Sequence, residues 1–171
     1  MSNPIVLIKT ELGDIIAEVN EDKAPITAAN FLQYVDHHLY DGTNFFRVVT
    51  KENSFPNQNV PIEVIQCGQV DKPKEFPPIE HETTQVTGLK HLDGALSMAR
   101  MKPGTATASF SIIINNQPEM DFNGKRNPDG QGFAVFGNVI SGMEIARKIH
   151  KQPKEEQRVK PPIKIYSISR R

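Results

Sequence analysis

The sequence lacks tryptophan, has a single cysteine, Cys67, and carries no net charge, because its 20 basic and 20 acidic side chains cancel. One cysteine cannot form an internal disulfide, which fits a reducing compartment, and Cys67 is expected to be a small core residue. Without net positive charge the chain has no long-range field that would attract phosphate backbones, so we expect no nucleic-acid partner.

Long apolar runs and export signals are also missing. Apolar runs such as 5–8 and 112–114 are far shorter than the roughly 20 residues that span a bilayer, so we expect no membrane partner. Residues 1–4 lead directly into a strand-like run without a basic segment or cleavage site, so we expect a cytoplasmic protein.

The five histidines follow no ligand spacing of a metal site, and we expect neither a metal nor a cofactor.

The composition is that of a folded globular domain. Of the 171 residues, 37% are hydrophobic and 23% are charged, which separates the chain from disordered sequences. The length lies within the usual range for one domain around one core. No internal repeat, linker or low-complexity segment interrupts it. We therefore expect a single domain over residues 1–171, and a monomer.

Short strand-like runs, rich in branched and aromatic side chains, dominate the pattern. Apolar residues recur at helical spacing in two segments, 28–38, with Pro25 at its entrance, and 142–150. Many short strands, two helices and no regular strand-helix alternation favour a mainly β protein, an antiparallel barrel or sandwich. The expected strands are 5–9, 15–19, 45–49, 62–67, 95–99, 110–114, 133–136 and 163–168.

Three stretches carry a resemblance to a known family. They are Phe-Leu-Gln-Tyr-Val (31–35) with Tyr-Asp-Gly-Thr-Asn-Phe-Phe-Arg-Val-Val (40–49), Leu-Lys-His (89–91) with Gly-Ala-Leu-Ser-Met-Ala-Arg (94–100), and Ala-Ser-Phe-Ser-Ile (108–112), which Phe-Ala-Val-Phe-Gly-Asn-Val (133–139) extends. In this order they resemble the motifs of cyclophilin-type peptidyl-prolyl cis-trans isomerases, of a bacterial-like subgroup. The resemblance implies a closed eight-stranded antiparallel β-barrel capped by two α-helices, with a substrate groove on its outer wall. It also implies an enzyme that isomerises X-Pro bonds in proteins and assists folding as a chaperone.

The resemblance assigns the catalytic roles to Arg47 and Gln66. A guanidinium offers rigid donors to the prolyl carbonyl and to the nitrogen of the twisted bond, and a glutamine on the next strand can position it. A solvated strand arginine is the plain alternative for Arg47, and its place in the Phe-Phe-Arg motif favours the catalytic interpretation. The residues expected to bind substrate are Glu63, Val64, Ala99, Arg100, Ser109, Ser111, Met120 and Phe133.

The socket for the proline ring departs from the family pattern. Loss of buried aromatic rings removes apolar contact, so we expect weaker proline binding and reduced activity, with Phe133 restoring part of the apolar surface. Glu119 stands in place of the aromatic residue that commonly contacts cyclosporin, so we expect weak or no cyclosporin binding. Where the family has two phenylalanines, a methionine and a leucine, this chain has Glu63, Ser111, Val64 and Met120.

Residues 50–61 form an insertion relative to the short connection that is usual in the family. Two interpretations stay open: the insertion roofs the groove, or it is a surface loop without a role, which long loops tolerate at low entropic cost.

Three functional hypotheses remain. The first is an isomerase, carried by Arg47 and Gln66. The second is a binding module of the same fold for proline-containing polypeptides with little or no turnover, carried by Glu63, Ser109 and Ser111. The third, an unrelated small-ligand barrel, requires the ordered motifs to be accidental.

Overall fold

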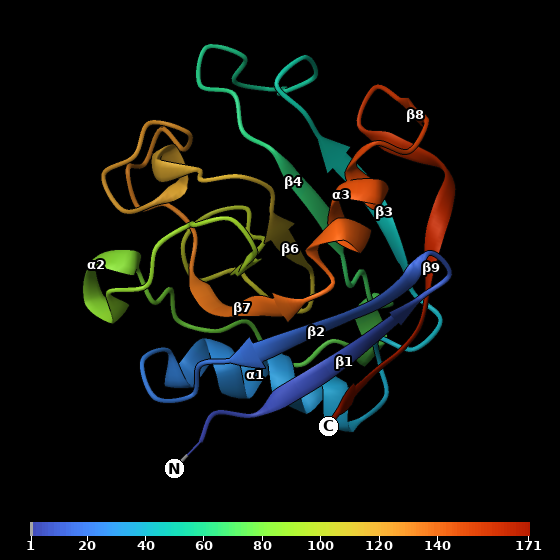
Figure 1. Cartoon of the computed structure of the whole chain (residues 1–171). Helices are drawn as coiled ribbons and strands as arrows, with labels where there is room; N and C mark the ends of the chain where they lie inside the picture. Colours follow the sequence, from blue (N-terminus) through green and yellow to red (C-terminus); the bar gives the residue numbers. More distant parts are fainter. Residues whose placement is uncertain (1) are drawn as a thin grey trace.

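Eight antiparallel strands close into a barrel in the structure, a computed structural model that describes residues 2–171 (Figure 1). Around the barrel the strand order is β1-β2-β7-β5-β6-β4-β3-β9, and the pairing of β9 with β1 closes the ring. Strand β8 pairs with β9 in a hairpin outside this ring. The strands are β1 (Ile5–Thr10), β2 (Gly13–Val19), β3 (Asn44–Val49), β4 (Val64–Cys67), β5 (Ala95–Met98), β6 (Phe110–Ile113), β7 (Val135–Ser141), β8 (Lys154–Glu155) and β9 (Arg158–Arg170).

Alternation along the strands fills the barrel interior. In a strand, successive side chains point to opposite faces, so every second residue can face the core. In the first hairpin Val6 lies opposite Ala17 and Ile8 lies opposite Ile15, and all four side chains are buried. These pairs form one continuous apolar surface inside the ring.

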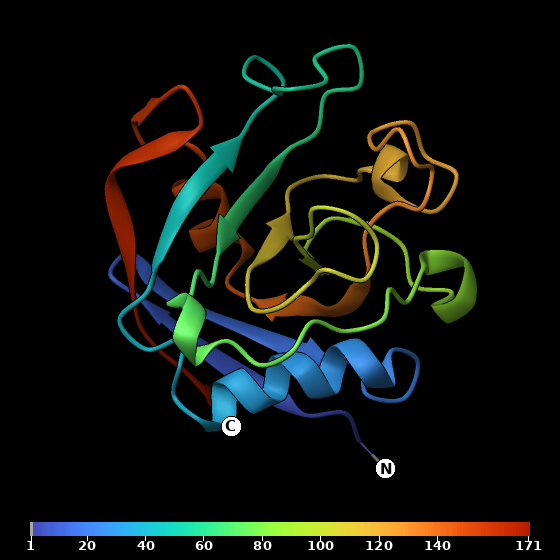
Figure 2. The same ribbon diagram turned by 180° about the vertical axis from the view of Figure 1, so that it is seen from behind.

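Two helices, α1 (Pro25–Asp36) and α3 (Met143–His150), pack on the strands of the barrel (Figure 1 and Figure 2). Helix α1 contacts β7 and β9, whereas α3 contacts β2, β3 and β4. The fully buried ring of Phe31 on α1 lies 5.1 Å from that of Phe110 and 4.9 Å from that of Phe136, measured between ring centroids. This aromatic cluster joins helix α1 to the barrel core.

A distant carboxylate caps the start of helix α1. Residue Ala24 precedes the helix and offers no side-chain oxygen. Instead, the buried carboxylate of Glu82 accepts hydrogen bonds from the backbone N–H groups of Ile26 (3.2 Å) and Thr27 (2.6 Å). A negative charge at a helix N-terminus is stabilising because the unpaired N–H groups carry partial positive charge. The segment around Glu82 therefore anchors α1.

The expected fold class, a closed eight-stranded antiparallel barrel capped by two helices, is confirmed, and three single-turn segments are added to it. These are helix α2 (Thr84–Thr87) and the 3₁₀ turns η1 (Lys72–Lys74) and η2 (Pro118–Met120). They are too short for a periodic pattern. In α2 the ends are set by Thr83, whose hydroxyl accepts from the Val86 N–H, and by Gly88 in the left-handed region (φ 78°). Among residues 2–171 no helix is long and apolar enough to cross a membrane.

Strands β7 and β9 differ most from their expected bounds. Strand β7 begins at Val135 and runs to Ser141, so Phe133 precedes the strand. Strand β9 spans Arg158–Arg170 and includes Pro161 and Pro162, where the missing N–H donors end the strand pattern in the sequence. The strand tolerates them because the register with β3 shifts between the pairs Phe45–Ile163 and Arg47–Arg158, so neither proline has a pairing partner on β3.

We expect Phe31→Ala to lower the free energy of unfolding by about 3–5 kcal/mol, because it removes a fully buried ring from the aromatic cluster. Urea denaturation measures this loss. The matched control is Phe55→Ala, since Phe55 is 50% exposed and should cost far less. Equal losses for the two variants would contradict the position assigned to Phe31.

Candidate active site

Arg47 lies on β3, and two glutamine side chains hold its guanidinium. Its Nε donates to Oε1 of Gln157 (2.8 Å), and its Nη1 donates to Oε1 of Gln66 (2.9 Å). Gln66 is the residue directly opposite Arg47 on β4, so the barrel register fixes the second contact. Burial lowers the pKa of the Arg47 guanidinium below its usual range, but an arginine stays charged. The result is a fixed cation whose hydrogen-bond partners are uncharged.

Arg47 faces a groove of about 610 Å³ in the barrel wall. The groove contains an apolar part formed by Ile62, Val64, Met120 and Phe133. Every residue expected from the sequence to act in the site lines this groove except Glu63. Those that the structure brings together are Arg47, Gln66, Val64, Ala99, Arg100, Ser109, Ser111, Met120 and Phe133.

The expectation that Glu63 faces the groove is wrong. Neighbouring residues of an extended chain point to opposite faces. Since Val64 lines the groove, Glu63 points away from it, and its carboxylate accepts a hydrogen bond from Nδ2 of Asn115 (3.1 Å). The groove position belongs to Ile62, which is 5% exposed. The socket is therefore more apolar than the sequence comparison suggested, and strand alternation was the signal that could have shown this.

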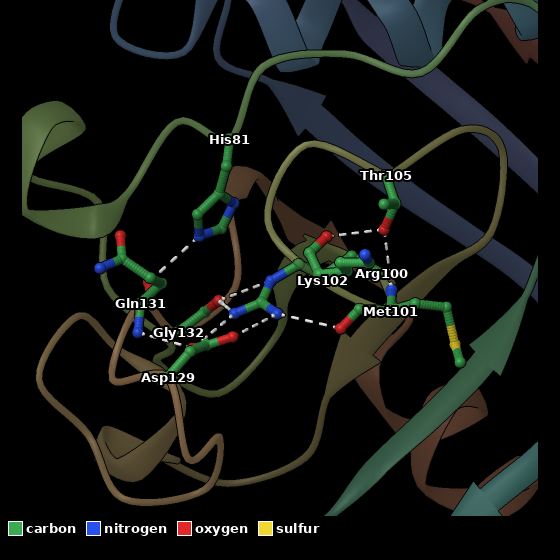
Figure 3. Close-up of polar contacts among 8 residues, drawn as sticks. All are labelled: His81, Arg100, Met101, Lys102, Thr105, Asp129, Gln131 and Gly132. Atoms are coloured by element: carbon green, nitrogen blue, oxygen red, sulfur yellow. Dashed lines mark hydrogen bonds and ion pairs between the residues drawn. The ribbon is translucent and has the colours of Figure 1, made fainter.

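Arg100 forms a network at one wall of the groove (Figure 3). Its Nη1 and Nη2 donate to the carboxylate of Asp129 (3.0 and 3.1 Å), and its Nε donates to the Gly132 carbonyl (3.1 Å). The hydrogen bond from Arg100 is the main reason that the pKa of Asp129 lies below its usual value. The same guanidinium lies 5.2 Å from the ring centroid of Phe133. Arg100 thus holds Phe133 beside the groove, and its own donors are occupied.

A Ser-His-Asp chain lies next to the groove. Nδ1 of His91 lies 2.7 Å from Oδ1 of Asp121, and its Nε2 lies 2.8 Å from Oγ of Ser97. A carboxylate can only accept, so Nδ1 carries the proton and Nε2 accepts from the serine hydroxyl. The order resembles that of a nucleophilic triad, but Ser97, although it borders the groove, is only 1% exposed. The chain is a structural link between β5 and the segment that carries Met120.

Two residues at the site, Gln157 and Arg126, were not predicted from the sequence. Gln157 precedes β9 and is 110 positions from Arg47 in the chain, and it belongs to a charged stretch without a motif. Arg126 lines the groove from the loop after η2 and is 6% exposed. Both hold the insertion: Nε2 of Gln157 donates to the Asn53 carbonyl (2.7 Å), and Nη2 of Arg126 donates to the Phe55 carbonyl (2.9 Å). No signal in a single sequence pairs these segments.

The insertion 50–61 is an ordered wall of the site. The buried hydroxyl of Ser54 donates to the carbonyl of Ile62 (3.0 Å) and accepts from its N–H (2.9 Å), which closes the loop at its base. Pro56 lines the groove itself, whereas Phe55 lines a neighbouring hollow together with Arg47 and Gln157. The insertion lies at the side of the groove, where Pro56 forms part of the lining.

Within the described part of the chain, no three His, Cys, Asp or Glu side chains are placed so that they could hold a metal ion. What the groove offers is a cation, hydrogen-bonding side chains and an apolar socket. That set can bind and polarise an amide without forming a covalent bond.

Comparison with known proteins agrees with this geometry. The family model "Cyclophilin type peptidyl-prolyl cis-trans isomerase/CLD" matches residues 5–170. A peptidyl-prolyl cis-trans isomerase of Acinetobacter baylyi is 36% identical over 98% of this chain and 86% of its own length. Peptidyl-prolyl cis-trans isomerase B of Escherichia coli is 36% identical over 85% of this chain and 83% of its own.

Solved structures show the same fold. A cyclophilin-type peptidyl-prolyl cis-trans isomerase of Cryptosporidium parvum aligns with a TM-score of 0.79 at 22% identity, covering 99% of this chain and 98% of that one. A second structure of that protein, in the presence of the dipeptide Ala-Pro, aligns with a TM-score of 0.73 and covers 98% of both chains.

The closed barrel and the arginine beside an apolar groove define a rotamase-type isomerase. This chain belongs to the cyclophilin-type peptidyl-prolyl cis-trans isomerase family.

The buried His91 predicts a pH dependence of stability. Burial lowers its pKa below the usual value of 6.5, against the opposing hydrogen bond to Asp121. The unfolded chain therefore binds a proton that the folded chain does not, and the free energy of unfolding falls as pH drops from about 7 to about 5. The lowered carboxyl pKa values of Asp36 and Asp129 change the free energy of unfolding only below this pH range, because the unfolded carboxyls titrate near pH 4.

Urea unfolding at a series of pH values measures this slope, and an NMR titration of the imidazole carbons of His91 gives its folded pKa directly. A folded pKa of His91 at or above 6.5 would contradict the prediction.

Proposed function

We propose that this isomerase acts on X-Pro bonds of polypeptides with Arg47 as the residue that contacts the prolyl group. One observation carries the proposal: the guanidinium, fixed by Gln66 and Gln157, faces the same groove as the apolar residues Val64 and Met120. A guanidinium has five N–H donors. Two of them bind glutamine oxygens, which leaves donors on Nη1 and Nη2 for a ligand.

The first requirement of the reaction is that the site stabilise the twisted amide more than the planar one. Resonance makes the uncatalysed barrier about 18–20 kcal/mol, and rotation breaks that resonance and leaves a lone pair on the prolyl nitrogen. A donor that binds this nitrogen or the prolyl carbonyl more strongly in the twisted state lowers the barrier. Arg47 is such a donor, and it requires no reorganisation because Gln66 and Gln157 already orient it.

The socket supplies the second requirement, which is to hold the ring still while the preceding carbonyl rotates. Ile62, Val64, Met120 and Phe133 present apolar surface next to Arg47. Ser111, at 7% exposure, keeps a small polar side chain where the family has an aromatic ring. The binding-module alternative loses one of its three supporting residues, because Glu63 lies outside the groove, whereas Ser109 and Ser111 line it.

The remaining expectations are part of the same proposal. Proline segments of unfolded or loop regions are the proposed substrates, which makes the enzyme a folding assistant, and we place it in the cytoplasm as a monomer. The Ala-Pro dipeptide present with the Cryptosporidium parvum relative supports proline-containing ligands. Weak cyclosporin binding is supported by Glu119, which is exposed and accepts a hydrogen bond from the Lys125 N–H (3.0 Å).

We expect Arg47→Ala to lower kcat/KM for a proline tetrapeptide by roughly a hundredfold or more, the usual effect of removing a preorganised donor. A protease-coupled isomerisation assay measures it. Arg158→Ala is the matched control, because it removes an exposed guanidinium from the β9 position opposite Arg47. Binding of proline peptides by the wild-type protein without any turnover would instead identify a binding module.

We further propose that Gln157 is a positioning residue for Arg47, and we expect Gln157→Ala to lower kcat by about tenfold with little change in KM. The variant removes the Nε acceptor and leaves the socket intact. The control is Gln152→Ala, a glutamine of similar exposure whose Nε2 donates to the Lys148 carbonyl (3.1 Å) away from the groove. A rise in KM with unchanged kcat would mean that Gln157 only shapes the binding surface.

A further inference from the structure

The groove is lined by cations without a matching anion. Arg47, Arg100 and Arg126 all line it, and no Asp or Glu does so among the residues that the structure describes. The charge of Arg100 is compensated by Asp129, at 3.0 Å. The other two guanidinium groups have no carboxylate partner among residues 2–171. The groove therefore carries two positive charges that form no ion pair, although Glu156 lines the neighbouring hollow together with Arg47.

Arg126 binds only main-chain carbonyls. Its Nη1 donates to the carbonyl oxygens of Ser54 (2.9 Å), Asn57 (2.7 Å) and Val60 (3.1 Å), and its Nη2 donates to that of Phe55 (2.9 Å). These acceptors all belong to the insertion. They satisfy hydrogen bonds but do not neutralise the charge. The insertion thereby places a second cation in the wall of the groove.

The two cations are close enough to affect each other. Burial lowers the pKa of Arg126, and the charge of Arg47 lowers it further. Beside Arg126, the buried Nδ2 atom of Asn127, another groove residue, has no acceptor among the described residues. This part of the groove therefore has donors and positive charge in excess, and a bound anionic group would relieve the repulsion.

We propose that the groove selects proline segments that carry an Asp or Glu side chain next to the proline. The inference rests on the proposed function, because the acidic residue must belong to the same peptide whose proline occupies the socket. A partly buried groove screens charge less than water does, so its attraction for a carboxylate exceeds that of an exposed arginine. A lysine at the same peptide position would meet two like charges and be disfavoured.

The test compares peptides that differ in one charge. Glu, Gln or Lys is placed immediately before proline in one series and immediately after it in a second, and NMR exchange measures isomerisation without an auxiliary protease. In at least one series we expect kcat/KM to be roughly threefold to tenfold higher for Glu than for Gln, and lower for Lys. These differences should shrink as salt is raised from about 0.02 M to about 0.5 M.

Substitutions of Arg126 test whether this residue causes the preference for acidic peptides. Arg126→Lys keeps the charge and should keep the Glu-to-Gln ratio above one, whereas Arg126→Met should bring it close to one. Arg170→Met is the control, because it removes an equal charge from an exposed pair with Asp36, and it should leave the ratio unchanged. Circular dichroism checks that each variant is folded, and the salt series on the wild-type protein tests the preference without any substitution.

The possible results distinguish three claims: the acidic preference, the role of Arg126 in it, and the isomerase activity itself. Equal kcat/KM for the Glu, Gln and Lys peptides at low salt would overturn the acidic preference and leave the isomerase intact. A preference that persists in folded Arg126→Met would overturn the role of Arg126. Absence of turnover for every peptide would contradict the proposed function itself, and the preference with it.

Discussion

The site depends on the fixed orientation of one guanidinium. Arg47 is held from two sides by uncharged amide oxygens, so its charge is positioned without being cancelled. A carboxylate partner would have fixed it as well, but would have reduced its attraction for a carbonyl or a prolyl lone pair. The closed barrel makes this possible, because β4 supplies Gln66 on one side of β3 and the turn before β9 supplies Gln157 on the other.

The insertion 50–61 holds both Gln157, which orients Arg47, and Arg126. Its carbonyl groups bind both Gln157 and Arg126, and the carbonyl of Phe55 accepts from each of them. One loop thus fixes the amide that orients Arg47 and also holds a second cation in the groove wall. The groove gains positive charge as a consequence of how the loop is held, and this links the positioning of Arg47 to the choice of substrate.

The sequence pattern predicted a mainly β protein with two helices, and the closed eight-stranded barrel followed from the resemblance of its ordered motifs to a known family. Arg47 was identifiable because it lies within one of these motifs, and Gln66 because it matches the family's glutamine on the next strand. Glu63 was assigned to the wrong face because an alignment to family positions was preferred over the two-residue period, which points to Ile62. Gln157 and Arg126 could not be found, because loop contacts between segments so far apart leave no local pattern in one sequence.

A structure with a bound proline tetrapeptide tests the orientation of Arg47 most directly. The proline ring should lie between Met120 and Phe133, with the prolyl carbonyl within hydrogen-bond distance of Nη1 or Nη2 of Arg47. The contacts of Arg47 to Gln66 and Gln157 should be retained. A peptide bound away from this groove, or an Arg47 side chain that leaves both glutamines and turns away from the prolyl group, would contradict the mechanism.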